Sequence, residues 1–203
     1  MQRRYALWFF LLVVAPLLIV CGHPWKTVVQ ARPNPFVNQR RFAVLPVAYE
    51  NLRVGDMREG DYLSEKDGEK WKSWQADKAA INDIYTAQLI ERAADSGVQV
   101  VRATGPGDAA FLIRPQVTWI EPGFYTAIVN KASEIKLTVK ITDPSGLVLD
   151  EIMIHRVVAS SGGVISAAIS DTMTSGGRLK QAGEEAGDVT GKYLRFRVEG
   201  NEE

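Results

Sequence analysis

Apolar and polar residues alternate with a strict period of two across Ser133–Thr142, which gives this segment one apolar face and one polar face. The pattern is typical of a half-solvated antiparallel strand. Asp143–Gly146 then supplies turn residues, because Pro fixes φ and Gly accepts positive φ. We therefore expect Leu147–Val158 to return as the partner strand, with a bulge at Asp150–Glu151, where the alternation breaks.

The first apolar run after the N-terminal region is Phe42–Ala48 (FAVLPVA), which is continuous rather than alternating. Such a run predicts a strand that is buried on both faces. Pro46 cannot donate to a sheet ladder, so we expect this strand at an edge or a bulge. Tyr49–Ser73 is charged and rich in turn residues, and it predicts a solvated loop with at most a single helical turn.

A long amphipathic helix is predicted for Trp74–Ser96, with Ser73 as its N-cap and Gly97 as its left-handed stop. Its apolar residues at helical spacing are Ile81, Ile84, Tyr85, Leu89 and Ala93. Val98–Val101 follows directly and predicts a second strand. Because a helix connects the two strands, we expect them to lie parallel with a right-handed crossover.

The rest of the chain completes the expected fold. Phe111–Ile120 predicts a further strand, Gly162–Gly177 predicts a flexible loop, and Leu179–Val198 predicts a closing helix. Three glycines at positions 183, 187 and 191 are expected to weaken that helix. The fold class is therefore α/β (α+β), with one sheet of about five strands that opens β-α-β, continues as an antiparallel meander and ends in a C-terminal helix. Residues 42–198 form a single domain, and residues 199–203 a polar tail.

The N-terminal region has the pattern of a secretory signal. Two arginines precede Tyr5–Val20, a run of 16 residues without a charge. The run contains Pro16 and is shorter than the ~20 residues of a membrane-spanning helix, so an uncleaved anchor is the second choice. We assign residues 1–20 to a signal peptide. Gly22–Arg41 is rich in proline and shows no periodicity, so residues 21–41 are interpreted as the anchor point and a tether.

The sequence Leu18–Gly22 (LIVCG) resembles the lipobox of bacterial lipoproteins, although Val20 stands where Gly, Ala or Ser is usual. This resemblance implies cleavage before Cys21, which would become the first mature residue and carry the acyl chains. Gly22 after the cysteine implies sorting to the outer membrane, with the domain on the periplasmic face. The covalent lipid on Cys21 is the only prosthetic group that we expect. A buried cysteine at the end of an uncleaved anchor is the alternative.

The whole pattern from Cys21 to the final helix resembles a loose group of uncharacterised Gram-negative envelope lipoproteins. Lipoprotein activators of penicillin-binding proteins and the amino-terminal domain of TolB belong to this group. The resemblance rests on Cys21, the FAVLPVA strand, the hairpin IKLTVKITDPSGLVLDEI and the Gly/Ser stretch before the last helix. It implies an accessory, non-enzymatic role.

Candidate catalytic groups are few. The two histidines are His23, in the expected tether, and His155, in a strand where a solvent-facing histidine is the simpler interpretation. No Cys pair or His-Glu-x-x-His motif predicts a metal site. The adjacent carboxylates Asp150–Glu151 and Glu184–Glu185 point in different directions on regular structure, so neither pair alone forms an acid–base couple. We expect no enzyme, and an envelope hydrolase that acts on peptidoglycan through carboxylates is the alternative.

Charge and aromatic residues bear on the partners. The chain has 24 basic and 24 acidic residues, so it lacks the basic excess of a nucleic-acid binder. Trp119, Phe124 and Tyr125 surround a Pro-Gly turn and are candidates for binding a protein partner, with core packing as the alternative. We thus expect a membrane-anchored docking or accessory subunit of an envelope complex. An auxiliary lipoprotein of a lipid ABC transporter is a further alternative, and assembly of identical copies stays open.

Overall fold

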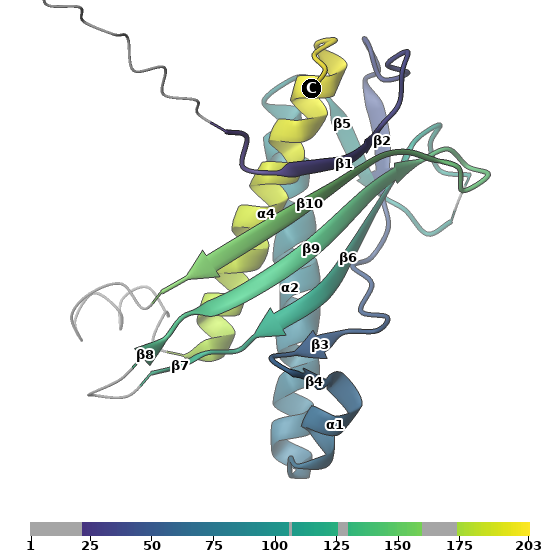
Figure 1. The fold of residues 1–203 in the computed structure, drawn as a ribbon. Coiled ribbons are helices and arrows are strands. Elements are labelled where there is room, and N and C mark those ends of the chain that lie inside the picture. The colour runs from purple at the N-terminus through teal and green to yellow at the C-terminus, as the bar shows by residue number, and fades with distance from the viewer. Residues whose placement is uncertain (1–21, 106, 126–129, 160–173) are drawn as a thin grey trace, which may run out of the picture.

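The computed structural model of the chain describes residues 22–105, 107–125, 130–159 and 174–203. Its elements follow in this order: β1 (Lys26–Gln30), β2 (Arg41–Val44), β3 (Arg53–Val54), β4 (Met57–Arg58), α1 (Glu59–Ser64), α2 (Gly68–Ala94), β5 (Gln99–Arg102), β6 (Leu112–Glu121), β7 (Phe124–Tyr125), β8 (Asn130–Lys131), β9 (Ser133–Thr142), β10 (Val148–Val158) and α4 (Ser175–Val198). The fold is mixed α/β with an open sheet and a closing helix, as predicted (Figure 1).

Eight of the described strands form one sheet, rather than the five that the sequence predicts, and β7 and β8 pair separately. The order is β1-β10-β9-β6-β2-β5, with β3 paired to β6 and β4 paired to β3. The β-α-β opening is confirmed, because β2 and β5 are parallel neighbours joined through α2. The count was too low because short strands such as β3 and β4 carry no periodic signal in two residues each.

Strand β2 lies inside the sheet, between β5 and β6, so the prediction of an edge or bulge position was wrong. The reason is that β2 ends at Val44, two residues before Pro46. The proline therefore occupies the connection that leaves the sheet, where no ladder donor is required. Further along this connection, the backbone N–H of Val47 donates instead to the side chain of Asn82 on α2, at 2.9 Å.

Helix α2 begins six residues earlier than Trp74, and its N-cap is Asp67 rather than Ser73. The Asp67 carboxylate accepts a hydrogen bond from the backbone N–H of Lys70 at 2.9 Å, which satisfies one of the free donors of the first turn. The expected loop at residues 49–73 thus contains β3, β4, α1 and the start of α2. The predicted stop is correct, since Gly97 adopts a φ of +69°.

The antiparallel meander β6-β9-β10 matches the alternation that predicts it. The apolar face of β9 is buried, with Ile135, Leu137, Val139 and Ile141 at most 1% exposed. The pairing of β9 with β10 shifts register between Val148 and Asp150, so a bulge lies at the predicted place. As a result Asp150 faces the covered side of the sheet and is fully buried.

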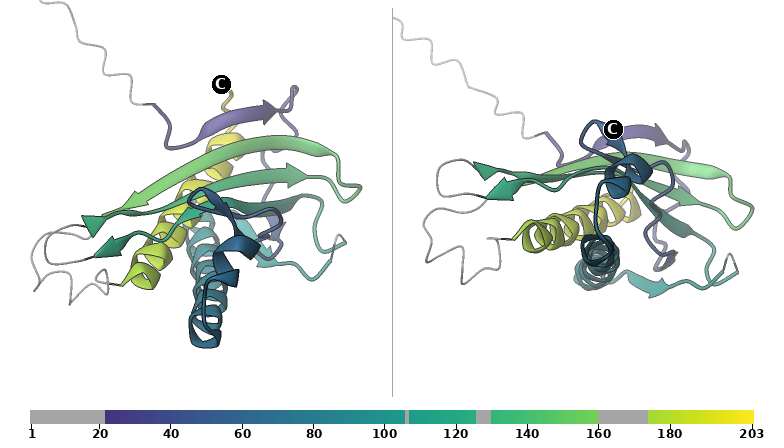
Figure 2. Two further views of the ribbon diagram at one scale, coloured as in Figure 1. Left: turned by 60° about the horizontal axis from the view of Figure 1, so that its bottom comes forward. Right: turned by 90° about the horizontal axis from the view of Figure 1, so that it is seen from below.

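Helices α2 and α4 lie side by side over one face of the sheet, while the other face is open (Figure 2). The glycines of α4 do not merely weaken it, as the sequence suggested. They form the contact with α2: a Cβ added at Gly187 would lie 2.4 Å from the backbone oxygen of Tyr85. Gly183 and Gly191 approach the same helix, at Ile81 and Arg92. The two backbones meet directly at Gly187, while Gly183 and Gly191 leave room for side chains of α2.

The tether interpretation of residues 21–41 is also corrected. Lys26–Gln30 forms β1, which pairs antiparallel with β10, and Phe36 is fully buried in the core. The sheet edge explains this, because β10 offers a row of backbone donors and acceptors that β1 satisfies. Only Gly22–Pro24 remain between Cys21 and the folded domain. Cys21, the signal segment and residues 160–173 lie outside the described residues.

Candidate functional site

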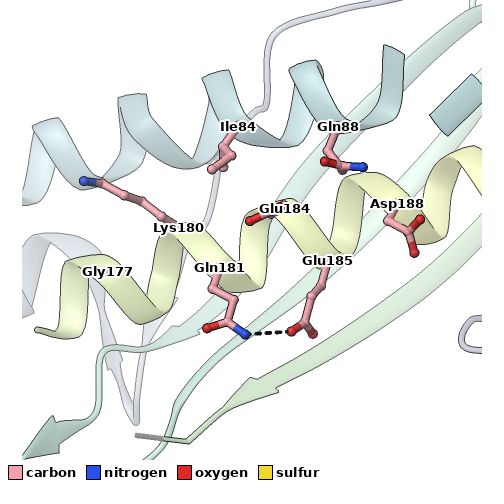
Figure 3. Close-up of a pocket in the computed structure, with 8 residues that line it drawn as sticks. All are labelled: Ile84, Gln88, Gly177, Lys180, Gln181, Glu184, Glu185 and Asp188. Atoms are coloured by element: carbon pink, nitrogen blue, oxygen red, sulfur yellow. Dashed lines mark hydrogen bonds between the residues drawn. The ribbon is translucent and has the colours of Figure 1, made fainter. Parts of the chain in front are cut away.

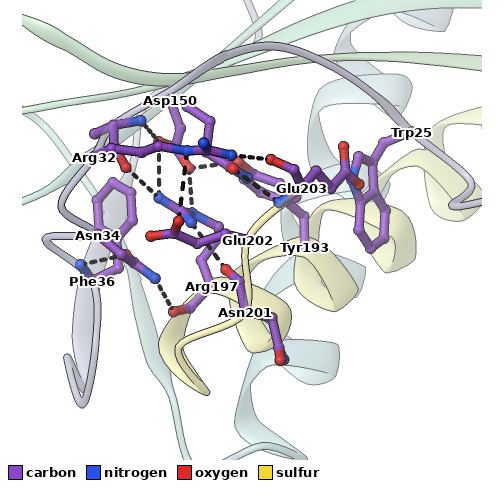
Figure 4. Close-up of polar contacts among 12 residues, drawn as sticks. Trp25, Arg32, Asn34, Phe36, Asp150, Tyr193, Arg197, Asn201, Glu202 and Glu203 are labelled. Carbon is purple, nitrogen blue, oxygen red and sulfur yellow. Dashed lines mark hydrogen bonds and ion pairs between the residues drawn. The ribbon is translucent and has the colours of Figure 1, made fainter.

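A buried polar network, here called the clasp, joins Asp150, Tyr193 and Arg197 (Figure 4). The carboxylate of Asp150 accepts hydrogen bonds from Arg197 Nε at 2.7 Å and from the Tyr193 hydroxyl at 2.5 Å. Both charged side chains are completely buried. Burial, together with the hydrogen bond to Asp150, raises the pKa of Tyr193 far above its usual range. A buried ion pair is tolerated only when its remaining donors and acceptors are satisfied, so the surroundings of Arg197 matter.

The segment after β1 supplies several of those partners. Arg197 Nη2 donates to the backbone oxygen of Ala31 at 3.0 Å, and the N–H of Ala31 donates to the Asp150 carboxylate at 2.9 Å. Asn34 donates to the backbone oxygen of Arg197 at 2.8 Å. The guanidinium also lies over the ring of Phe36, 5.7 Å from its centre. The clasp therefore fixes the N-terminal segment to the last two turns of α4.

The clasp continues outward to both ends of the described chain. The His23 ring stacks on Trp25 at 4.5 Å, and Trp25 meets the edge of Tyr193 at 5.4 Å. Trp25 Nε1 donates to the carboxylate of Glu203 at 2.9 Å, and Arg32 donates to the backbone oxygen of the same residue. The predicted polar tail 199–203 thus folds back onto the N-terminal segment. The chain is held to the domain as far out as His23.

A groove of about 630 Å³ runs between α2 and α4 (Figure 3). Its carboxylates come from one helix, namely Glu184, Glu185 and Asp188. Glu184 and Glu185 point apart, as expected for adjacent helical residues. Asp188 is engaged by Lys192 at 2.6 Å and by Arg92 at 3.3 Å. The groove is acidic, and its carboxylates do not face one another across a cleft as an acid–base pair would.

The predicted partner-binding aromatics have different surroundings. Trp119 is half-buried, donates from Nε1 to the backbone oxygen of Gly55 at 2.9 Å, and carries the Lys136 ammonium 4.4 Å from its ring centre. Phe124 is 48% exposed, at the start of β7. The side chain of Tyr125 is outside the description. Phe124 is therefore available for a partner, whereas Trp119 already serves the contact between β6 and the β3–β4 hairpin.

The histidines and possible metal ligands add no catalytic arrangement. His155 is exposed and pairs with Glu134 at 2.9 Å across the strands, in keeping with a solvent-facing position. Within the part of the chain that the structure describes, no group of three His, Cys, Asp or Glu side chains is placed to hold a metal ion. Among the described helices, none combines the length and the apolar character that crossing a bilayer requires.

Sequence reasoning missed the clasp, although two signals for it were present. Asp150 breaks the alternation of its strand, which was interpreted only as a bulge. Arg197 lies on the apolar side of the closing helix, four residues after Tyr193, at a spacing that puts both on one face. Nothing in the sequence pairs these residues with one another or with residues 31–34, because the contacts span between 43 and 166 positions.

Comparisons with known proteins give similar solved structures at low sequence identity and low TM-score. No protein-family model matches the chain, and no curated protein matches its sequence. Similar solved structures include the PelC dodecamer from Paraburkholderia phytofirmans, at 13% identity and a TM-score of 0.40 over 80% of this chain and 95% of that chain. Protein XCC0632 from Xanthomonas campestris, described by the family model DUF330, is 16% identical with a TM-score of 0.42 over 84% and 93%.

A homolog of the neuraminyllactose-binding hemagglutinin from Helicobacter pylori is 10% identical, with a TM-score of 0.33 over 83% of this chain and 92% of that chain. All three TM-scores are below 0.5. The names of these proteins therefore assign neither a function nor an assembly to this chain.

Proposed function

We propose that this protein is a lipid-anchored lipoprotein of the cell envelope that serves as a non-enzymatic accessory or docking subunit. One observation carries the proposal: the lipobox-like sequence ending at Cys21 stands directly before a segment that is clasped onto the domain. His23 contacts Trp25 and Phe196, and Trp25 in turn packs on Tyr193. An anchor at Cys21 would thus be joined to a fixed point of the fold.

The short connection determines how the domain would be presented. An extended chain spans at most ~3.6 Å per residue, so Trp25 would lie within about 14 Å of the lipidated residue. Each buried acyl CH₂ contributes ~0.8 kcal/mol, and several chains would make the attachment essentially permanent. The proposed location is the periplasmic face of the outer membrane, which Gly22 implies through the lipoprotein resemblance. The acyl chains on Cys21 are the only prosthetic group in the proposal.

Docking would use the parts of the domain that its own core leaves uncovered. Phe124 is exposed at the end of the sheet opposite β1 (Figure 1), so it would face away from the anchored end. Trp119 lies nearby on β6 and would support this end rather than contact a partner directly. The partner in this proposal is another envelope protein, and assembly of identical copies is compatible with it.

The experiment that tests the anchor is metabolic labelling with radioactive palmitate in a Gram-negative host. The wild-type chain is expected to take up label and to fractionate with the outer membrane, whereas Cys21→Ser is expected to lose the label. Val20→Ala is the matched control, since it changes the neighbouring residue toward the usual lipobox and should keep the label or increase it. Absence of label from both the wild-type chain and Val20→Ala would rule out the lipid anchor.

A further inference from the structure

We infer that the open side of the sheet edge formed by β1 and β10 docks on the surface of the phospholipid bilayer. The inference rests on the proposed function, which supplies the anchor, and it adds which surface of the domain meets the lipid. The surface, here called the edge strip, consists of Lys26, Val28, Val29, Met153 and Val157.

The edge strip gathers exposed apolar side chains. Val28, Val29, Met153 and Val157 are between 40% and 53% exposed, and they are four of the nine large apolar side chains that are exposed among the described residues. Lys26 and Met153 are direct cross-strand partners. A bulge between Thr27 and Val29 leaves both valines of β1 accessible. Polar side chains lie among them, since Glu151 pairs with Val29 and His155 lies between Met153 and Val157 on the same face of β10. Exposed apolar residues that are bordered by polar ones commonly mark an interaction surface.

The edge strip lies close to the point where the chain leaves the fold toward Cys21. The backbone oxygen of Pro24 accepts a hydrogen bond from Arg156 at 3.1 Å, so the linker runs beside β10 next to Val157. Cys21 is three residues from Pro24, a span of at most about 11 Å. Since the polar zone of a bilayer is about 6 Å deep on each side, an anchor at Cys21 would keep this edge within reach of the headgroups.

The chemistry of the edge strip suits a lipid surface. Aliphatic side chains bury partly at the boundary between headgroups and acyl chains, and a lysine among them can extend its ammonium to a phosphate. β1 is also the outermost strand of the sheet, so its outer backbone groups are open to headgroups.

One exposed apolar residue away from this edge serves as a comparison. Met57 is in β4, at the opposite end of the molecule from β1 (Figure 1). Its exposed fraction of 39% matches the 40% of Val29. The two positions therefore differ in their distance from the anchor rather than in their accessibility, and Met57 is the matched control.

The test places a fluorescent probe on the full lipidated chain in vesicles of phosphatidylethanolamine and phosphatidylglycerol. The chain has one cysteine, and the acyl chain blocks its thiol, so Val29→Cys and Met57→Cys each offer a single site for an environment-sensitive dye. A headgroup nitroxide lipid is expected to quench the dye at position 29 several-fold more than the dye at position 57. Met153→Cys, on the neighbouring strand, should behave like position 29.

Three other outcomes would overturn the inference in distinguishable ways. Equally weak quenching at positions 29 and 57, in a chain that carries palmitate and floats with the vesicles, removes the docking but leaves the anchor. Protection of position 29 from aqueous iodide without quenching by lipid would assign the edge strip to a protein instead. Loss of palmitate and of flotation would overturn the proposed function as well.

Discussion

Helix α4 is held to the fold in two regions by opposite means. Along its middle it meets α2 through the seam, defined here as Gly183, Gly187 and Gly191. The α2 backbone contacts Gly187 directly, and side chains of α2 fill the space beside the other two glycines. In its last turns it is held by the clasp, where Arg197 and Tyr193 bond to the buried Asp150. The seam contains no charge and depends on the absence of side-chain volume, whereas the clasp depends on the balance of one buried charge by another.

Because of this difference, the seam and the clasp should be sensitive to different kinds of substitution. A close-packed seam responds to added atoms, because interiors have little free space and backbones cannot move aside cheaply. A buried ion pair responds to the loss of one partner, because the remaining charge has no water to solvate it. The clasp also binds the N-terminal segment that leads to Cys21, so its failure would release that segment, while failure of the seam would separate the two helices.

The largest effect is expected from breaking the clasp on one side. Asp150→Ala leaves the Arg197 guanidinium buried without its carboxylate, and we expect the free energy of unfolding to fall by about 3–5 kcal/mol. Urea denaturation measures this loss. The double variant Asp150→Leu/Arg197→Met removes both charges and should be less destabilised than the single one. A double variant that loses as much as the sum of both single variants would contradict the role of unbalanced charge.

The second prediction compares the stability of two glycine substitutions in α4. Gly187→Ala would place a Cβ 2.4 Å from the Tyr85 backbone oxygen, so the helices must separate. We expect a loss of about 3 kcal/mol, despite the gain of ~1 kcal/mol in helix propensity. Gly183→Ala is the control, since the nearest atom there is a side-chain carbon of Ile84 at 3.2 Å. Its stability should stay within about 1 kcal/mol of the wild type, and equal losses at both positions would contradict a direct backbone contact that is specific to Gly187.

The smallest effect concerns the Tyr193 hydroxyl. Tyr193→Phe removes one hydrogen bond to the Asp150 carboxylate, and we expect a loss of about 1.5 kcal/mol at neutral pH. Burial raises the pKa of Tyr193 above its value of about 10 in the unfolded chain. The stabilisation from the neutral hydroxyl is therefore complete below pH ~10 and declines as the pH rises toward the folded-state pKa.

Denaturation midpoints measured from pH 8 to pH 12 check this dependence. The decline above pH ~10 should be shallower in Tyr193→Phe than in the wild type. Burial also raises the pKa of Tyr85, so Tyr85→Phe should remove a separate part of the same decline and serves as the comparison. An identical alkaline decline in the wild type and in Tyr193→Phe would mean that the hydroxyl of the clasp does not titrate with unfolding.

Local periodicity predicted the elements that carry a repeated signal. The alternation of Ser133–Thr142, the DPSG turn and the helical spacing after Trp74 each lead to the observed element. The segments without a repeat were misjudged. Lys26–Gln30 is a strand because β10 offers an unpaired edge, and the true helix start at Asp67 follows from a local carboxylate that the choice of Ser73 overlooked.

The residues of the candidate site also differ in whether local sequence could predict them. The predicted anchor point at Cys21 is inferred from consecutive residues, because the lipobox-like pattern is a local sequence property. The clasp cannot be inferred from consecutive residues, since Asp150 and Arg197 are 47 positions apart and Ala31 is 166 positions from Arg197. Phe124 and Trp119 were both predicted as partner-binding candidates, but only the fold distinguishes the exposure of Phe124 from the half-buried position of Trp119.

The sequence by itself determined the order of strands and helices in the β-α-β opening and the meander, and it predicts an anchor point at Cys21. These features depend on contacts within a few residues or on a regular period. The tertiary structure decided that the three glycines of α4 form a seam, that a buried ion pair closes the fold, and that the supposed tether is an edge strand. Each of those outcomes depends on what a residue meets across the chain, since desolvation and close packing are properties of the assembled neighbours and not of the segment.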